Sequence, residues 1–290
     1  MLCHVDVLPK MFKLAVILIL FLIGIGFCES YGQDKKERDS LFGVTLTGHA
    51  QAILKKVEQI YEKEVREEWM PVSSSQAGNS KVGDDGAPII YIHPSTGRNV
   101  STIVHELYHF VQRAEGYPAI MWLMPVTMDT KENQLAFHQL AQQLYDPILH
   151  YAFFDTLISL NIRPNEPFEL GTRQVLQNGT LDSIFETMDK RAIALYYFKA
   201  RLELKDAALL EQIVVLLNIK NKDEGLALGQ KIAHLVLDST PLNPKESVGI
   251  LVQCLNLIYE AQFDFKQREW TSRQLGKHLQ KIVSIELRVL

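Results

Sequence analysis

The sequence has few cysteines and lacks any long run of basic residues. Its 30 lysines and arginines are scattered among 34 aspartates and glutamates, which gives a net charge of −4 over 290 residues. This balance does not support a surface that follows phosphates, so we expect no nucleic-acid partner. The 47% hydrophobic content can bury an ordinary globular core, which excludes a disordered or fibrous protein and suggests one large or two smaller domains.

The sequence also lacks an apolar run as long as the roughly 20 residues that a membrane-spanning helix needs. Its main apolar stretch, Leu14–Phe27, is shorter and follows Lys10 and Lys13, an arrangement typical of a secretory signal peptide. Small residues within Ser30–Gly32 predict cleavage there, so that residues 1–32 are removed. We therefore expect an exported protein, periplasmic or secreted, that meets a membrane only through this segment.

Cys28 allows an alternative, in which a lipid attached to this residue holds the protein at a membrane. The bulky Phe27 before it disfavours this reading, because lipoprotein processing sites carry a small residue at that position. Of the three cysteines, only Cys254 remains after removal of residues 1–32, so the mature chain has no internal disulfide. Its stability must come from packing.

Periodicity predicts the order of structural elements in the first half of the mature chain. Apolar residues recur every three or four positions over residues 47–69, which predicts a helix that ends before Pro71. Residues 73–87 have the Ser, Gly and Asp content of a surface loop, and the β-branched run at residues 89–92 predicts a strand. A further helix is predicted from residues 99–101 to about residue 115.

The rest of the chain has mainly helical patterns. A long helix is predicted over residues 131–160, interrupted at Pro147. Beyond residue 163 all patterns favour helix, over residues 181–204, 206–218, 223–238, 244–263 and 270–288. We expect an α+β fold that is predominantly α, with short strands within residues 33–162 and an all-helical region over residues 163–290.

The helix predicted at residues 99–115 carries the pattern His105-Glu106-x-x-His109. About 0.02 chance matches are expected in a chain of this composition. Since successive helical residues are about 100° apart, His105 and His109 project about 40° apart and one turn from each other. Two imidazoles can thus converge on one metal ion, while Glu106 is placed to contact a water there. The opposite face is apolar, so the helix can bury its back in a core.

In this motif and its surroundings, roughly residues 88–115, the sequence resembles the HExxH zinc metallopeptidases, the zincins. The resemblance implies that His105 and His109 bind Zn²⁺ and that Glu106 is the general base that activates a metal-bound water for peptide-bond hydrolysis. It further implies a zincin-like metallopeptidase region over residues 33–162, a peptide or protein substrate, and an edge strand at residues 89–92 on which an extended peptide lies.

The third ligand must come from outside the motif. The longer metzincin pattern is absent, because Gln112 and Glu115 occupy the positions where it requires Gly and His. One face of the helix at residues 131–160 offers Glu132, Asp146 and His150. We favour Asp146 as the ligand, with His150 and Glu132 as alternatives.

Two other functions are compatible with the same residues. The first is a catalytically inactive zincin-like scaffold of the cell envelope that binds metal or a protein partner. The second is a helical envelope protein in which the HExxH pattern is accidental. Metal content tests the second alternative, and hydrolysis of peptides tests the first.

Overall fold

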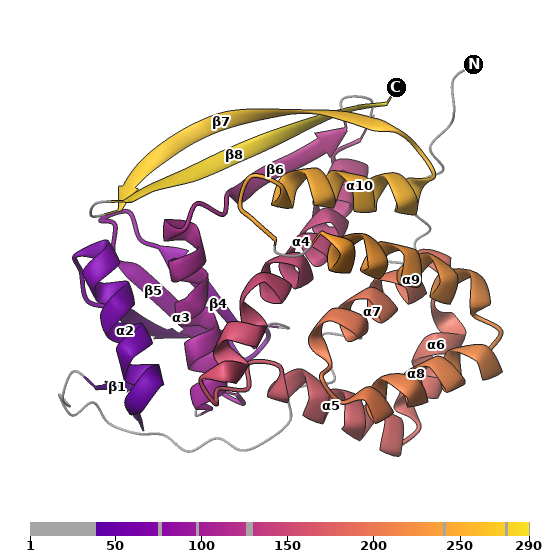
Figure 1. Ribbon diagram of the computed structural model, residues 1–290, viewed down its shortest axis with the longest axis horizontal. Coiled ribbons are helices and arrows are strands. Elements are labelled where there is room, and N and C mark those ends of the chain that lie inside the picture. Colours follow the sequence, from indigo (N-terminus) through magenta and orange to yellow (C-terminus); the bar gives the residue numbers. More distant parts are fainter. Residues whose placement is uncertain are drawn as a thin grey trace.

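A computed structural model describes residues 39–74, 77–96, 99–125, 130–239, 242–275 and 278–289. The predicted signal peptide and Cys28 lie outside the described residues. Within those ranges, no helix combines the length and the hydrophobicity that crossing a membrane requires. The fold is α+β and predominantly α, as predicted (Figure 1).

The first part of the chain forms a small sheet with helices packed against it. Its elements are β1 (Ser40–Leu41), β2 (Val44–Thr45), α2 (Gly48–Tyr61), β3 (Arg66–Trp69), β4 (Gly78–Val82), β5 (Pro88–Ile92) and α3 (Val100–Ala114). β1 and β2 form an antiparallel pair. The three-stranded sheet has the order β3-β5-β4, with β5 parallel to β3 and antiparallel to β4. This places β4 at one edge of the sheet.

Three predictions for this part were wrong. The helix predicted over residues 47–69 ends at Tyr61, and its last residues form β3 instead. The loop predicted at residues 73–87 contains β4, and β5, predicted to be the edge strand, is the central one. All four residues of β3 are exposed, so no apolar alternation marks it as a strand. β3 and β4 are strands because both pair with the apolar β5. Such pairing between distant segments cannot be recognised from a local sequence pattern.

Helix α3 was predicted correctly. Asn99 caps its first turn, because the side chain accepts a hydrogen bond from the backbone N–H of Ser101. Its apolar face is fully buried and includes Ile103, Leu107 and Phe110. This burial fixes the orientation of the helix and therefore the direction of its polar face.

The long helix α4 (Lys131–Ser159) begins where predicted but is not interrupted at Pro147. A proline inside a helix removes one backbone hydrogen bond. Leu144 and Ile148, on either side of Pro147, are both fully buried, and their packing keeps the two halves in one helix.

The second half of the chain is a helical region followed by a hairpin. Its helices are α5 (Glu166–Gln177), α6 (Thr180–Thr187), α7 (Lys190–Glu203), α8 (Ala207–Ile219), α9 (Asp223–Asp238) and α10 (Ser247–Tyr259). The region is not all-helical, because β7 (Phe263–Leu275) and β8 (His278–Val289) replace the helix predicted at residues 270–288. β8 pairs with β7 and, in parallel, with β6 (Ala119–Pro125), which follows α3 (Figure 1).

Two hydrophobic cores share helix α4. The smaller core combines α2, α3 and β5 with the end of α4, including Phe153, Phe154 and Leu157. The larger core combines the start of α4, through Leu144 and Ile148, with the later helices and β8. The predicted division at residue 162 stays a prediction. Residues 149–152 of α4 lie where the two cores meet.

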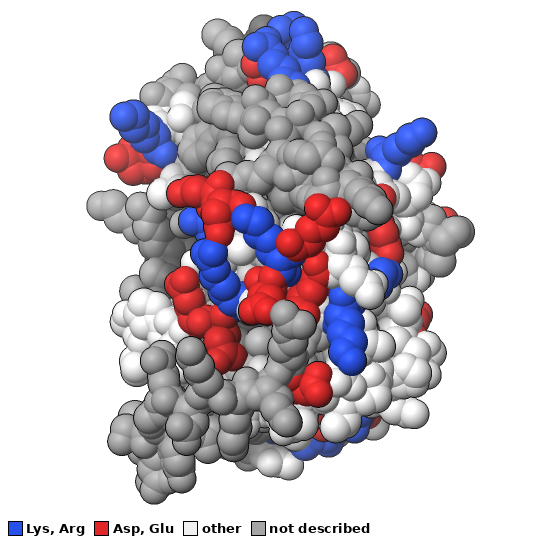
Figure 2. Space-filling view, turned by 90° about the vertical axis from the view of Figure 1, so that its left-hand side faces the viewer, with Lys and Arg blue, Asp and Glu red and all other residues white. Residues whose placement is uncertain are grey.

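The face presented by α2 and the first sheet carries intermixed charges. Figure 2 shows basic and acidic side chains alternating on this side of the molecule. Ion pairs join Arg66 and Lys63 to Asp85, and Lys56 to Glu115. These described ion pairs place opposite charges next to one another on this face.

Candidate metal centre

Helix α3 presents His105 and His109 on its polar face, one turn apart. Their Nε2 atoms are 3.2 Å from each other. Two nitrogens that bind Zn²⁺ at about 2.0–2.1 Å in a tetrahedral arrangement lie about 3.3 Å apart. The spacing of the two imidazoles therefore fits two ligands of one ion.

Helix α4 supplies a third imidazole. His105, His109 and His150 each offer one ligand atom, and these atoms all lie within 4.8 Å of one another. The side chain of His150 is buried, whereas His105 and His109 are partly exposed. The two histidines of α3 are therefore the more exposed members of the group, and His150 is the buried one.

Aromatic side chains surround the buried side of this group. The ring of Phe154 stacks on His150 with centroids 5.0 Å apart, and Phe153 contacts His105 with centroids 5.6 Å apart. Such walls exclude water and fix the imidazoles in place. They also strengthen electrostatic interactions at the site, because the local dielectric constant is low.

His150 is held in the orientation of a ligand. Its Nδ1 atom is 2.7 Å from Oε1 of Glu203, which lies at the end of α7. Its Nε2 atom is buried and has no hydrogen-bond partner. Metal-binding histidines commonly have this arrangement, in which one ring nitrogen is hydrogen-bonded to a carboxylate and the other is free to bind the metal. The unsatisfied Nε2 atom is therefore an observation of this structure that fits a metal ion.

His109 is oriented by a second chain of hydrogen bonds. Its Nδ1 atom is 3.2 Å from Oε1 of Gln112, and the amide nitrogen of Gln112 donates to the backbone carbonyl of Leu149, 2.8 Å away. Because the amide nitrogen of Gln112 donates to Leu149, the amide oxygen is left to accept a hydrogen bond from the Nδ1–H of His109. This leaves Nε2 of His109 unprotonated and directed at His105.

The protonation states of the three histidines favour metal binding at two of them. Burial, followed by the charge of His150, lowers the pKa of both His105 and His109 well below its usual value. Burial also lowers the pKa of His150, but the carboxylate of Glu203 more than offsets this, so its pKa is raised. Near neutral pH, His105 and His109 therefore carry free ring nitrogens without losing a proton.

Glu106 lies beside the histidines in a nearly closed position. It is 6% exposed, and burial, followed by the negative charge of Asp146, raises the pKa of its carboxyl group to about 8. Hydrogen bonding by the side chain of Ser80 in β4 acts in the opposite direction and lowers this pKa. A Cβ atom added to Gly78 would lie 2.7 Å from Oε1 of Glu106, so the backbone of β4 covers this carboxyl group directly.

The favoured third ligand, Asp146, lies outside the group of three. It is exposed and sits on α4 one turn before His150, where its charge acts on Glu106 and His109. Glu132 is exposed near the start of α4, about 27 Å along the helix from His150. The structure thus brings together His150, one of the two alternatives, with the two histidines of the motif.

Two residues of the site, Glu203 and Ser80, are not marked by any local sequence pattern. Glu203 follows His150 by more than 50 residues, and only the packing of α7 on α4 brings them together. Ser80 lies in a segment whose composition indicates a loop. Its position as part of an edge strand becomes clear only from its pairing with β5.

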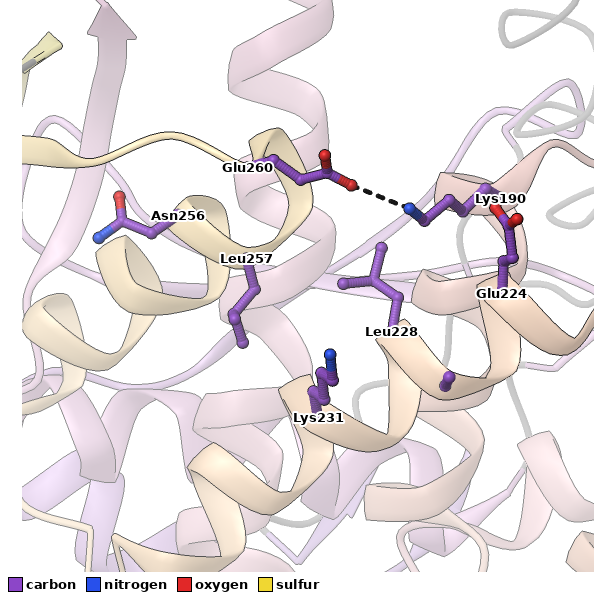
Figure 3. Close-up of a pocket in the computed structure, with 8 residues that line it drawn as sticks. Lys190, Glu224, Leu228, Lys231, Asn256, Leu257 and Glu260 are labelled. Carbon is purple, nitrogen blue, oxygen red and sulfur yellow. Dashed lines mark hydrogen bonds and ion pairs between the residues drawn. The ribbon is translucent and has the colours of Figure 1, made fainter.

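A surface cavity of about 380 Å³ lies elsewhere, between α9 and α10 (Figure 3). Its lining includes Lys190, at the opposite end of α7 from Glu203 and about 20 Å away along that helix. It is therefore separate from the three histidines.

Comparisons with known proteins do not place the chain in a family. No family model, no curated protein and no solved structure matched it.

Proposed function

We propose that the protein is a zinc-dependent peptidase in which His105, His109 and His150 hold the metal and Glu106 is the general base. The observation that carries this proposal is the meeting of the three histidines, with the unpartnered Nε2 atom of His150 among them. Three imidazole nitrogens and an open fourth position are a common ligand set of catalytic zinc. His105 and His109, the partly exposed members of the group, lie on the side from which a fourth ligand would approach.

Each residue of the site has a separate role in the proposed reaction. Zn²⁺ would supply a Lewis acid that polarises the peptide carbonyl and lowers the pKa of a water from 15.7 towards about 7. Glu106, next to His105 in sequence, accepts the proton and returns it to the leaving amine. Glu203 holds His150 by its Nδ1 atom, and Gln112 holds His109 in the same way. The aromatic rings of Phe153 and Phe154 exclude water from the buried side.

The wild-type protein and one variant test this function. Wild-type protein purified without chelators should contain about one equivalent of zinc and cleave members of a peptide library. Glu106→Gln should keep the zinc and lose cleavage by 10²-fold or more, because proton transfer typically contributes about 10²–10⁴-fold. A wild-type protein without zinc would contradict the proposal.

A second candidate function is an inactive metal-binding scaffold, and one observation favours it. Glu106 is 6% exposed and lies under the backbone of Gly78, which leaves its carboxyl group little access to solvent. Zinc binding without cleavage of any peptide in the library, in wild type as in Glu106→Gln, would select this function.

We infer export from the charged and apolar pattern of residues 1–32, which lies outside the described structure. Cleavage of this segment is tested by N-terminal sequencing of the protein from its native host. A mature chain that starts at or near Gln33 is the expected result, and a lipid on Cys28 would select the lipoprotein alternative.

A further inference from the structure

Buried polar side chains from edge strand β4 and helix α3 form a series of contacts that ends at Glu106. A terminal nitrogen of Arg113, Nη2, donates to the backbone carbonyl of Ser80 at 2.7 Å and to its hydroxyl oxygen at 3.0 Å. Arg113 lies two turns after Glu106 on the same face of α3, and its guanidinium group also stacks over the ring of Phe110. Contacts therefore hold the guanidinium group of Arg113 both at its flat face, on Phe110, and at its edge, on Ser80.

The hydrogen-bond capacities of these groups determine the direction of the chain. A guanidinium group only donates, so the hydroxyl oxygen of Ser80 must accept from Arg113. The single proton of the hydroxyl is then available for Glu106, whose carboxyl group only accepts once it is ionised. Hydrogen bonding by the side chain of Ser80 accordingly acts to lower the pKa of Glu106, against the effect of burial. The order of donation is therefore Arg113 to Ser80 to Glu106.

Gly78 completes the enclosure of Glu106 from the same strand. Residues 78 and 80 point to one face of β4, since side chains in a strand alternate. At position 78 even a methyl group would collide with Oε1 of Glu106. Glycine therefore leaves the space that the carboxyl group occupies, while Ser80 provides its hydrogen bond.

We propose that Ser80 and Arg113 are positioning residues, which hold one oxygen of Glu106 so that the other faces the three histidines. This inference rests on the proposed function for its catalytic consequence, but the hydrogen bond itself does not depend on catalysis. Neither residue contacts the reacting atoms. Their role is to prevent the side chain of Glu106 from rotating away from its working position.

Substitution of Ser80 tests this role with two independent readouts. Ser80→Ala should keep one equivalent of zinc and the KM of the wild type, while kcat falls about 10-fold to 100-fold, a part of what a general base contributes. Ser80→Thr keeps the hydroxyl and should restore most of kcat. Asn79→Ala, an exposed neighbour on the other face of β4, is the matched control and should leave both constants unchanged.

The second readout is the infrared carboxyl band of Glu106, identified by its loss in Glu106→Gln. Removal of the hydroxyl donor should shift this band in Ser80→Ala and leave it unchanged in Asn79→Ala. Gly78→Ala should also lower kcat, because the added methyl group would lie 2.7 Å from Oε1 of Glu106 and displace the carboxyl group.

The outcomes separate the two proposals. Zinc binding without peptide cleavage in the wild type would overturn the proposed function, and the infrared band would still test the hydrogen bond. Wild-type cleavage with an unchanged kcat and an unshifted band in Ser80→Ala would overturn the positioning role.

Arg113→Lys serves as a second variant, because it keeps the charge and one donor but cannot stack and donate as the guanidinium group does. It should lower kcat as Ser80→Ala does, and wild-type kcat in this variant would exclude Arg113 from the chain.

Discussion

Nδ1 of His150 and Oε1 of Glu203 lie 2.7 Å apart, although the two residues belong to different helices. Both side chains are almost fully buried. The contact joins the end of α7, in the larger core, to the point of α4 at which the two cores meet. The helical second half of the chain therefore contributes directly to the candidate metal centre.

Glu203→Gln should weaken zinc binding. Loss of such an outer partner typically costs about 10-fold to 100-fold in metal affinity. The amide keeps the volume of the side chain but removes the charge that supports His150. Competition with a zinc-sensitive dye measures the Kd, and Glu211→Gln, at an exposed position on α8, is the control. Equal affinities in the two variants would show that Glu203 does not support a ligand.

Substitution of each candidate third ligand distinguishes His150 from Asp146. We expect His150→Gln to lose most of its zinc after dialysis, because an amide is a poor zinc ligand. Asp146→Asn should keep about one equivalent, since Asp146 lies outside the group of three histidines. Metal analysis by mass spectrometry measures both. The reverse pattern would assign the ligand role to Asp146.

Zinc binding should release close to one proton or less at about pH 6.5. The pKa values of His105 and His109 are lowered, so these residues have already lost their protons, whereas the raised pKa of His150 keeps it largely protonated. Affinity should therefore fall as the pH drops below the pKa of His150. Calorimetry in buffers of different ionisation enthalpy counts the protons. Release of two or more would mean that His105 or His109 is protonated in the metal-free protein.

The stability of the metal-free protein should depend on Glu106. Its pKa is raised from 4.5 to about 8, so between these values the folded protein binds a proton that the unfolded chain does not. The free energy of unfolding therefore decreases as the pH rises through this window. Glu106→Gln removes this contribution and should be relatively more stable at about pH 8 than at about pH 5. Urea unfolding with a chelator present measures the difference, and an equal pH dependence in both proteins would refute it.

The helix pair α7 and α9 should tolerate no side chain at Gly229. A Cβ atom there would lie 2.7 Å from the backbone carbonyl oxygen of Ala194, so Gly229→Ala forces the two helices apart. Overpacking of this kind typically costs about 1–3 kcal/mol. Gly249→Ala, in α10, meets nothing within 4 Å and should stabilise the protein by up to about 1 kcal/mol. Thermal unfolding compares the two variants. A stabilised Gly229→Ala would show that the helices can separate without cost.

The parts of the site that were predictable are those determined within one helix. The positions of His105 and His109 follow from the geometry of α3, whose apolar face also fixes its orientation. The third histidine depends on how α4 crosses α3. The sequence Asp146-Pro147 is typical of a helix start, but buried neighbours keep α4 continuous through it.

The largest error in the predicted fold concerns β8. Val283, Ile285 and Leu287 are buried in the larger core, and this alternation is the pattern of a strand with one buried face. It was assigned to a helix because apolar residues in the same stretch also recur at helical spacing. Short apolar runs of this kind are compatible with a helix or a strand, and the neighbouring segments determine which one forms. Here β8 pairs with both β6 and β7.

The parallel pairing of β6 with β8 has a consequence for the order of synthesis. β6 leaves the ribosome roughly 150 residues before the strand that completes its sheet, so this pairing is a late, slow step of high contact order. All residues of the candidate metal centre, up to Glu203, are translated earlier. A nascent chain that has reached α8 therefore already contains every candidate metal ligand, while β6 still presents an unpaired edge to chaperones or to other nascent chains.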